Sequence, residues 1–193
     1  MNKKIEEYIK KEESIKEFEN SIYKAVDNFF AGLSEEEKNK IFSSKSFDSK
    51  PQKQISAQAY EFHRNKEYEK ALPLFIELAE HADPFACYIV GDYFYHGYGI
   101  NFSYEEAYKY YGLGMKYGSN DCRYKCGYML FYGEGVAQDV VKGLETIEDA
   151  AFFGSEEAIN TLIEIYENGI FVDADYEVAD YWRSKSELEI GDA

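Results

Sequence analysis

The sequence predicts an all-α fold, a solenoid in which short helical pairs stack on one another. Small residues and glycines recur at a fixed spacing of 36 residues along the second half of the chain. Between them lie amphipathic segments that begin at helix-capping side chains and end at glycines. A fixed period in this range is typical of stacked supersecondary units. Caps followed by glycine stops are typical of helices.

The repeat is carried by glycines that keep the same register. These glycines are Gly91, Gly97, Gly99, Gly127, Gly133, Gly135 and Gly169. Gly97, Gly133 and Gly169 lie 36 residues apart, at the end of the first helix of successive units. The register predicts three repeats over residues 83–118, 119–154 and 155–186, followed by a short tail.

Each repeat is predicted to be a helix–turn–helix. In the first repeat, Asp83 is suited to an N-cap and Pro84 to the first helical turn, and Gly97 stops that helix. Ser103 then begins a second helix, and Glu106 completes a capping box. The later repeats follow the same order of caps and glycine stops.

Residues 1–82 contain three further parts. Residues 53–82 predict a shorter, tetratricopeptide-like helical pair that joins the same stack, and residues 43–52 predict a linker. Apolar side chains at steps of three and four predict an amphipathic helix in residues 1–42. This segment either caps the solenoid or docks another chain. A cap is preferred because the ends of a solenoid need covering.

Residues 121–151 read DCRYKCGYMLFYGEGVAQDVVKGLETIEDAA, and they resemble the Sel-1-like repeat, a relative of the tetratricopeptide repeat. The matching positions are Cys122, Cys126-Gly127, Gly133, Gly135-Val136, Asp139, Lys142-Gly143, Ala150-Ala151 and Gly154. The resemblance extends over residues 83–193, although the third repeat has Phe171 in place of the second loop glycine. It implies a right-handed α-solenoid used as an interaction scaffold or adaptor, with the first helix of each pair on the concave side. Some proteins that neutralise toxins in bacterial competition are similar.

The first helices carry stripes of side chains spaced i, i+4, i+7, so each stripe lies on one helical face. The stripes are Tyr88, Asp92 and Tyr95; Tyr124, Tyr128 and Phe131; and Asn160, Glu164 and Glu167. Tyrosines with charges nearby are typical of binding hot spots. The stripes therefore predict a partner-binding groove, aromatic at one end and acidic at the other. The alternative is that several of these tyrosines pack between neighbouring helices.

Charge narrows the choice of partner. Asp and Glu number 37 against 21 Lys and Arg, a formal net charge of −16. Residues 83–193 hold 21 of the acidic and only 7 of the basic side chains. Lys and Arg supply the affinity for nucleic acids and for anionic membrane surfaces, so both are poor partners. A basic protein partner is expected instead.

Catalytic and metal-binding patterns are weak. Cys122 and Cys126 lie four residues apart and would present two thiolates on one helical face, but they occupy positions where the repeat has small buried residues. No clear fourth ligand accompanies them and Cys87. The three histidines are scattered without a Ser/His/Asp or Cys/His signature. We therefore expect no catalytic residue, no metal and no cofactor.

The sequence thus predicts a non-enzymatic protein–protein interaction module of a bacterial cytoplasm. Its N-terminus lacks the apolar stretch of a secretory signal, and its odd cysteine count does not suit a disulfide scaffold. The more specific hypothesis is an immunity-type inhibitor that binds and neutralises a basic toxin or effector domain. The alternative is a scaffold or signalling adaptor that assembles several protein partners.

Overall fold

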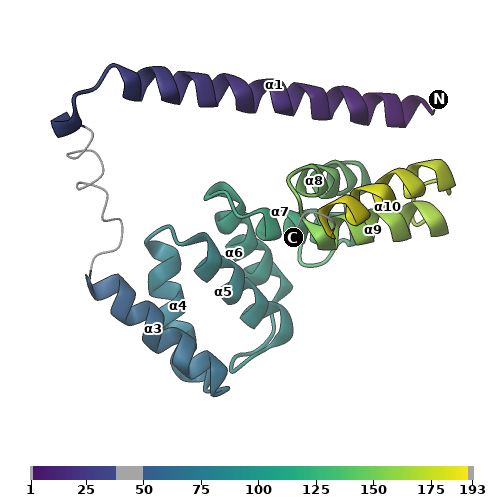
Figure 1. The fold of residues 1–193 in the computed structure, drawn as a ribbon. Helices are drawn as coiled ribbons and strands as arrows, with labels where there is room; N and C mark the ends of the chain where they lie inside the picture. The colour runs from purple at the N-terminus through teal and green to yellow at the C-terminus, as the bar shows by residue number, and fades with distance from the viewer. Residues whose placement is uncertain (1, 38–49, 191–193) are drawn as a thin grey trace. The chain divides into compact units, whose positions relative to one another are not determined.

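The computed structural model describes residues 2–37 and 50–190, and within these ranges it contains helices and no strand. This confirms the predicted all-α class (Figure 1). The chain divides into two compact units, residues 1–53 and 54–193.

The first unit is dominated by α1 (Lys3–Ala31), a single unbroken helix despite its polar stretch around Glu12. After it, Ser34 and Glu37 form a capping box. The Ser34 backbone N–H donates to Glu37 Oε2 at 2.8 Å, and the Glu37 N–H donates to Ser34 Oγ at 3.3 Å. The predicted linker over 43–52 lies outside the described residues up to position 49, and its last three residues belong to the next helix.

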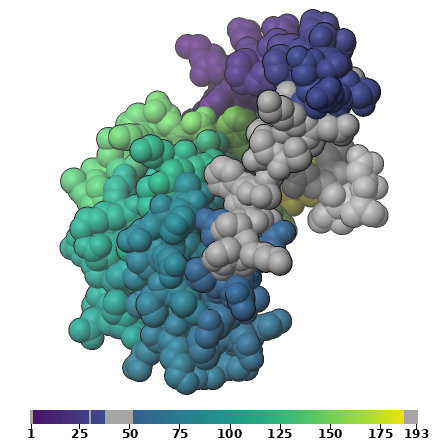
Figure 2. All heavy atoms as spheres, turned by 90° about the vertical axis from the view of Figure 1, so that its left-hand side faces the viewer, coloured from purple at the N-terminus to yellow at the C-terminus, as the bar shows by residue number. Residues whose placement is uncertain are grey.

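The second unit is a stack of helical pairs. Its helices are α3 (Lys50–Arg64), α4 (Tyr68–Glu80), α5 (Pro84–His96), α6 (Tyr104–Lys116), α7 (Asn120–Tyr132), α8 (Val140–Phe152), α9 (Glu156–Asn168) and α10 (Tyr176–Ile190). From α4 onward each helix contacts the next along the chain, as the solenoid requires. Figure 2 shows the same order, with the packed surface passing from blue through teal to green.

Side-chain caps and left-handed glycines set the helix boundaries. The Asp83 carboxylate accepts from the N–H groups of Phe85 and Ala86 at 3.0 and 3.1 Å, which starts α5. Gly97, Gly133 and Gly169 end α5, α7 and α9 with φ of 71°, 76° and 66°, a backbone region that favours glycine.

The capping box predicted at Ser103 forms only in part. Ser103 Oγ accepts from the Glu106 N–H at 3.2 Å. The Glu106 carboxylate does not return this contact: the Ser103 N–H donates to the Phe94 carbonyl at 2.9 Å, and Glu106 accepts from the Lys109 ammonium at 2.5 Å.

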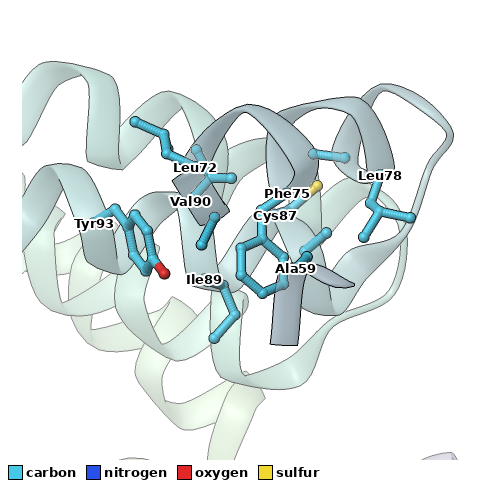
Figure 3. Packing of buried hydrophobic residues seen from close by; sticks show 11 residues of the cluster. Ala59, Leu72, Phe75, Leu78, Cys87, Ile89, Val90 and Tyr93 are labelled. Atoms are coloured by element: carbon cyan, nitrogen blue, oxygen red, sulfur yellow. The ribbon is translucent and has the colours of Figure 1, made fainter. Parts of the chain in front are cut away.

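A continuous core runs between the early helices, and Figure 3 shows side chains of α3, α4 and α5 converging in it. Phe75 of α4 is fully buried and meets the ring edges of Tyr60 and Tyr93, with centroids 5.3 and 6.1 Å apart. Burying large apolar side chains in this way contributes about 25 cal/mol per Å² removed from water. The pair preceding the repeats therefore packs against α5.

Close helix packing explains one repeat glycine directly. A Cβ at Gly91 would lie 2.4 Å from Cε1 of Tyr111, which is fully buried. Only glycine at this position lets the Tyr111 ring of α6 lie against the backbone of α5.

Candidate partner-binding surface

The first helices of the three repeats, α5, α7 and α9, carry the predicted stripes; we call the nine stripe residues the first-helix face. Helices α5 and α7 contact each other. Helices α7 and α9 are joined by a 3.0 Å hydrogen bond between the hydroxyls of Tyr124 and Thr161. The stripes of neighbouring repeats are therefore side by side.

A cavity of about 230 Å³ opens between α5 and α7. It is lined by Tyr95, Tyr124, Lys125, Tyr128 and Met129. Met129 is fully buried, whereas the three tyrosines are partly exposed. The aromatic part of the first-helix face therefore contains a cavity as well as exposed ring surface.

Tyr88 and Tyr95 each combine packing with exposure. Tyr95 donates a 2.7 Å hydrogen bond to Glu134 Oε2, and the Tyr88 ring lies 6.0 Å from that of Tyr111. Burial, followed by the bond to Glu134, raises the pKa of Tyr95. Burial, followed by the charge of Asp92, raises the pKa of Tyr88. Both phenols stay protonated at neutral pH and present neutral rings.

Asp92 is held by the core. Its Oδ1 accepts a 2.5 Å hydrogen bond from the hydroxyl of buried Tyr111, and its side chain is only partly exposed. A charged acceptor of this kind is a strong partner for a buried phenol. Asp92 therefore has a structural contact as well as its place in the predicted stripe.

The prediction for Phe131 is wrong. This ring is fully buried, so it has no surface to offer a partner. The ring of Phe171 lies 5.4 Å away and edge-on, in the loop after α9. The equivalent loop position in the preceding repeat is Gly135, which has no side chain to cover Tyr95. The single departure from the repeat at Phe171 thus removes Phe131 from the surface.

The acidic end of the first-helix face is partly neutralised. Asn160 and Glu164 are exposed on α9. Glu167 instead forms an ion pair with Arg183 of α10. Of the two carboxylates in this stripe, Glu164 is therefore more exposed than Glu167.

Lys125 was not among the predicted site residues, although it lines the cavity. In the repeat register it corresponds to Ile89 and Thr161, both buried at 9% exposure. The sequence did contain a signal for this residue: a lysine stands where the neighbouring repeats have Ile89 and Thr161.

The charges of Asp121 and Glu157 act on each other. Burial, and next the charge of Glu157, raise the pKa of Asp121, although Lys125 lowers it. The charges of both carboxylates also reach Tyr88, whose pKa they help to raise. Like charges repel each other, so a cation placed near them would be stabilised.

The cysteines are buried free thiols. Burial raises the pKa of Cys87 to about 11 and that of Cys122 and Cys126 to about 12. Over residues 2–37 and 50–190, no group of three or more His, Cys, Asp or Glu side chains is placed to hold a metal ion. In the same ranges no helix is both long and apolar enough to cross a bilayer.

The architecture agrees with that of known repeat proteins. A Sel1 repeat protein from Oxalobacter formigenes superposes with a TM-score of 0.64 and 24% sequence identity, over 72% of this chain and 58% of that one. The solenoid thus has the fold of Sel-1-like repeat proteins. A protective antigen of uropathogenic Escherichia coli strains, described as having an SLR (Sel-1-like repeat) fold, superposes with a TM-score of 0.65 and 22% identity, over 72% of this chain and 30% of that one.

Sequence comparison gives the same repeat type over a shorter stretch. A segment of 78 residues is 36% identical to protein sel-1 homolog 2 of Rattus norvegicus and 35% identical to that of Mus musculus. The match covers 40% of this chain and only 11% of the relatives' length. No family model matches the chain. The sequence and structure comparisons therefore agree on the repeat type.

Proposed function

We propose that this chain is a non-enzymatic binding module whose first-helix face receives a basic protein. The observation that carries the proposal is the cavity between α5 and α7, which is lined by tyrosine rings and has the Glu134 carboxylate hydrogen-bonded to one of them, Tyr95. Tyrosine supplies a large contact area at interfaces. Carboxylates at a surface favour the approach of a positively charged protein and raise its association rate.

The charge distribution supports the same partner. With 21 acidic and 7 basic side chains, residues 83–193 form a strongly negative solenoid. Nucleic acids and anionic membranes would be repelled by it, whereas a cationic protein would be attracted.

Within this function, the narrower proposal is an immunity-type inhibitor that neutralises a basic toxin or effector domain in the bacterial cytoplasm. A compact, acidic, repeat-built surface suits sequestration of one cationic partner, since the binding energy is concentrated on one face. The three free thiols are compatible with a reducing compartment.

The test is affinity capture on the tagged full-length chain at low salt, followed by elution in a salt gradient and mass spectrometry. The protein so found is then purified, and its dissociation constant is measured at several salt concentrations. We expect one stoichiometric basic protein whose affinity falls steeply with salt. Several weak partners, or none, would contradict sequestration of a single basic domain.

A pair of charge-reversal variants localises the contact. Glu157→Lys with Glu164→Lys changes exposed carboxylates of α9 and should weaken binding at least tenfold. Glu167 is a poorer choice because its reversal would also break the ion pair with Arg183. The matched control is Glu145→Lys with Glu177→Lys on α8 and α10. Equal losses in both variants would mean that net charge, and not the first-helix face, governs binding.

A scaffold that assembles several proteins is the second candidate, and α1 favours it. Its C-terminal half exposes large apolar side chains, among them Phe18, Ile22 and Phe29 at 64, 45 and 57% exposure. Deleting residues 1–37 would distinguish the two roles. A docking arm predicts loss of one partner at unchanged solenoid stability, whereas a cap predicts a lower melting temperature.

A further inference from the structure

Lys125 contacts two tyrosine rings of the neighbouring helix. Its ammonium nitrogen lies 5.9 Å from the ring centroid of Tyr88 and 5.8 Å from that of Tyr95. Among the described residues no carboxylate oxygen comes within 4.0 Å of this ammonium, although Asp121 is one helical turn away. The Lys125 ammonium therefore lies near two aromatic rings and makes no direct ion pair with the described residues.

We propose that the cavity between α5 and α7 is a receptor for one lysine or arginine side chain of a protein partner, and that Lys125 competes for its tyrosine faces in the free protein. This proposal rests on the proposed function, since it names the chemical group that the first-helix face recognises. The tyrosines that line the receptor are Tyr95, Tyr124 and Tyr128, and Tyr88 lies beside it, near the Lys125 ammonium.

The cavity has the chemistry of a cation site. The rings of Tyr124 and Tyr128 lie 6.0 Å apart at a steep angle, so their faces point in different directions around the space. The face of an aromatic ring carries negative potential and attracts ammonium and guanidinium groups within about 6 Å. With a volume of about 230 Å³, the cavity has room for a single side chain.

The surrounding charge selects a cation over an apolar group. Glu134 is held beside the cavity by its bond from Tyr95, and Glu164 lies near enough for its charge to raise the pKa of Tyr128. The charge of Glu157 also acts on Asp121, which Lys125 partly compensates in the free protein. An apolar side chain would leave these charges uncompensated, and an anionic one would add to the repulsion.

Lys125 is not needed by the repeat itself. The equivalent positions carry Ile89 and Thr161, so the stack forms without a cation at this point. Its charge stabilises the free cavity and must leave the rings when a partner's side chain enters. Removing that charge should therefore strengthen binding of an external cation.

The experiment measures binding of n-butylammonium, which has the shape and charge of a lysine side chain, to the full chain. Ring resonances of the tyrosines are followed by NMR at constant ionic strength, with n-butanol as the neutral probe. We expect saturable shifts of the cavity tyrosines with n-butylammonium and much weaker ones with n-butanol. Equal binding of both probes, or shifts that never saturate, would overturn the proposal.

Two substitutions test the effects of the Lys125 charge and of the Tyr95 ring on n-butylammonium binding, and each has a control. Lys125→Met should tighten n-butylammonium binding by roughly three- to tenfold, and Tyr95→Leu should weaken it by a similar factor. Lys142→Met on α8 removes the same charge elsewhere and should change nothing. Tyr95→Phe keeps the ring and loses only the bond to Glu134, so it should bind nearly as the unmodified chain does. No difference between Lys125→Met and Lys142→Met would overturn the competition.

The result is separable from that for the proposed function. A basic partner whose binding depends on Glu157 and Glu164, with no n-butylammonium site, would retain the function and reject the receptor. A saturable n-butylammonium site in a chain that captures no basic partner would retain the receptor and reject the function.

Discussion

The hydroxyl of Tyr111 donates a 2.5 Å hydrogen bond to Oδ1 of Asp92, which joins the buried side of α6 to the first-helix face on α5. The phenol is fully buried, and the ring lies where a side chain at Gly91 would have to be. One contact thus connects the repeat glycine, the core and the surface.

Breaking this bond should lower stability without removing bulk. Tyr111→Phe should reduce the free energy of unfolding by about 1.5–3 kcal/mol, because a hydrogen bond to a charged acceptor is lost. Urea unfolding followed by circular dichroism would measure it. Tyr128→Phe, whose hydroxyl has no hydrogen bond to the described residues, is the control and should stay within about 0.5 kcal/mol. Similar losses in both variants would contradict the assignment.

The turn after α4 is strained at a position where later repeats have glycine. Ala82 has φ of +63°, and its counterparts Gly118 and Gly154 have +90° and +82°. Ala82→Gly should therefore stabilise the chain by about 0.5–1 kcal/mol. Gly118→Ala should destabilise it by a similar amount. A Cβ at Gly118 would meet no atom within 4 Å, so the cost comes only from holding an alanine in the left-handed backbone region. Changes of the same sign in the two variants would refute this account.

Phe171 combines backbone strain with useful packing. Its φ is +58°, while its ring lies against Phe131 and Tyr132. Phe171→Ala keeps the strain and loses the ring, so it should destabilise the chain by about 1 kcal/mol. Phe171→Gly also loses the ring but relieves the strain. Its free energy of unfolding should therefore be about 1 kcal/mol higher than that of Phe171→Ala. If the alanine variant proved the more stable in thermal or urea unfolding, the strain would not be real.

Stability should fall in alkali. Burial raises the pKa of Tyr60 and Tyr93 from 10.0 to about 12 in the folded chain. Between pH 10 and 12 the unfolded state therefore holds fewer protons, and the free energy of unfolding decreases as pH rises; below pH 10 this contribution is fully present. Urea unfolding at pH 8, 10 and 11, with tyrosinate absorbance at 295 nm, tests this. A stability that is flat or rising over that range would argue against it.

The thiols should be unreactive in the folded chain. With pKa values of about 11 to 12, Cys87, Cys122 and Cys126 are fully protonated at pH 8, and they are buried. Ellman's reagent should react with them only as fast as the solenoid opens, and rapidly in denaturant. Fast stoichiometric reaction at pH 8 without denaturant would reopen a thiol-based role for the pair Cys122 and Cys126.

Most of the fold could be predicted from the sequence because repetition makes local signals redundant. Asp83 and Gly97 bound α5 as expected, and the same signals recur one period later. The site was less predictable. A single side chain from the next loop, Phe171, buries Phe131, and Arg183 of another helix engages Glu167. Such contacts depend on the position of a side chain from another element, and the residue pattern along one helix does not predict that position.

Lys125 shows the same limit from the other side. Its register position predicts a buried residue, yet the flexible stem of lysine carries the charge to the faces of Tyr88 and Tyr95. The contact needs two helices in place before it can be recognised.

The order of contacts along the stack also has a mechanical consequence. Among the described helices of the second unit, each helix from α4 onward touches mainly the next one along the chain, so the two ends of this stack are joined through the helices between them. A pulling force, such as that of an unfolding protease, would peel the stack away one pair at a time. A protein bound across α5, α7 and α9 would act as a brace over three neighbouring pairs, so that capture of a partner would also protect the chain from degradation.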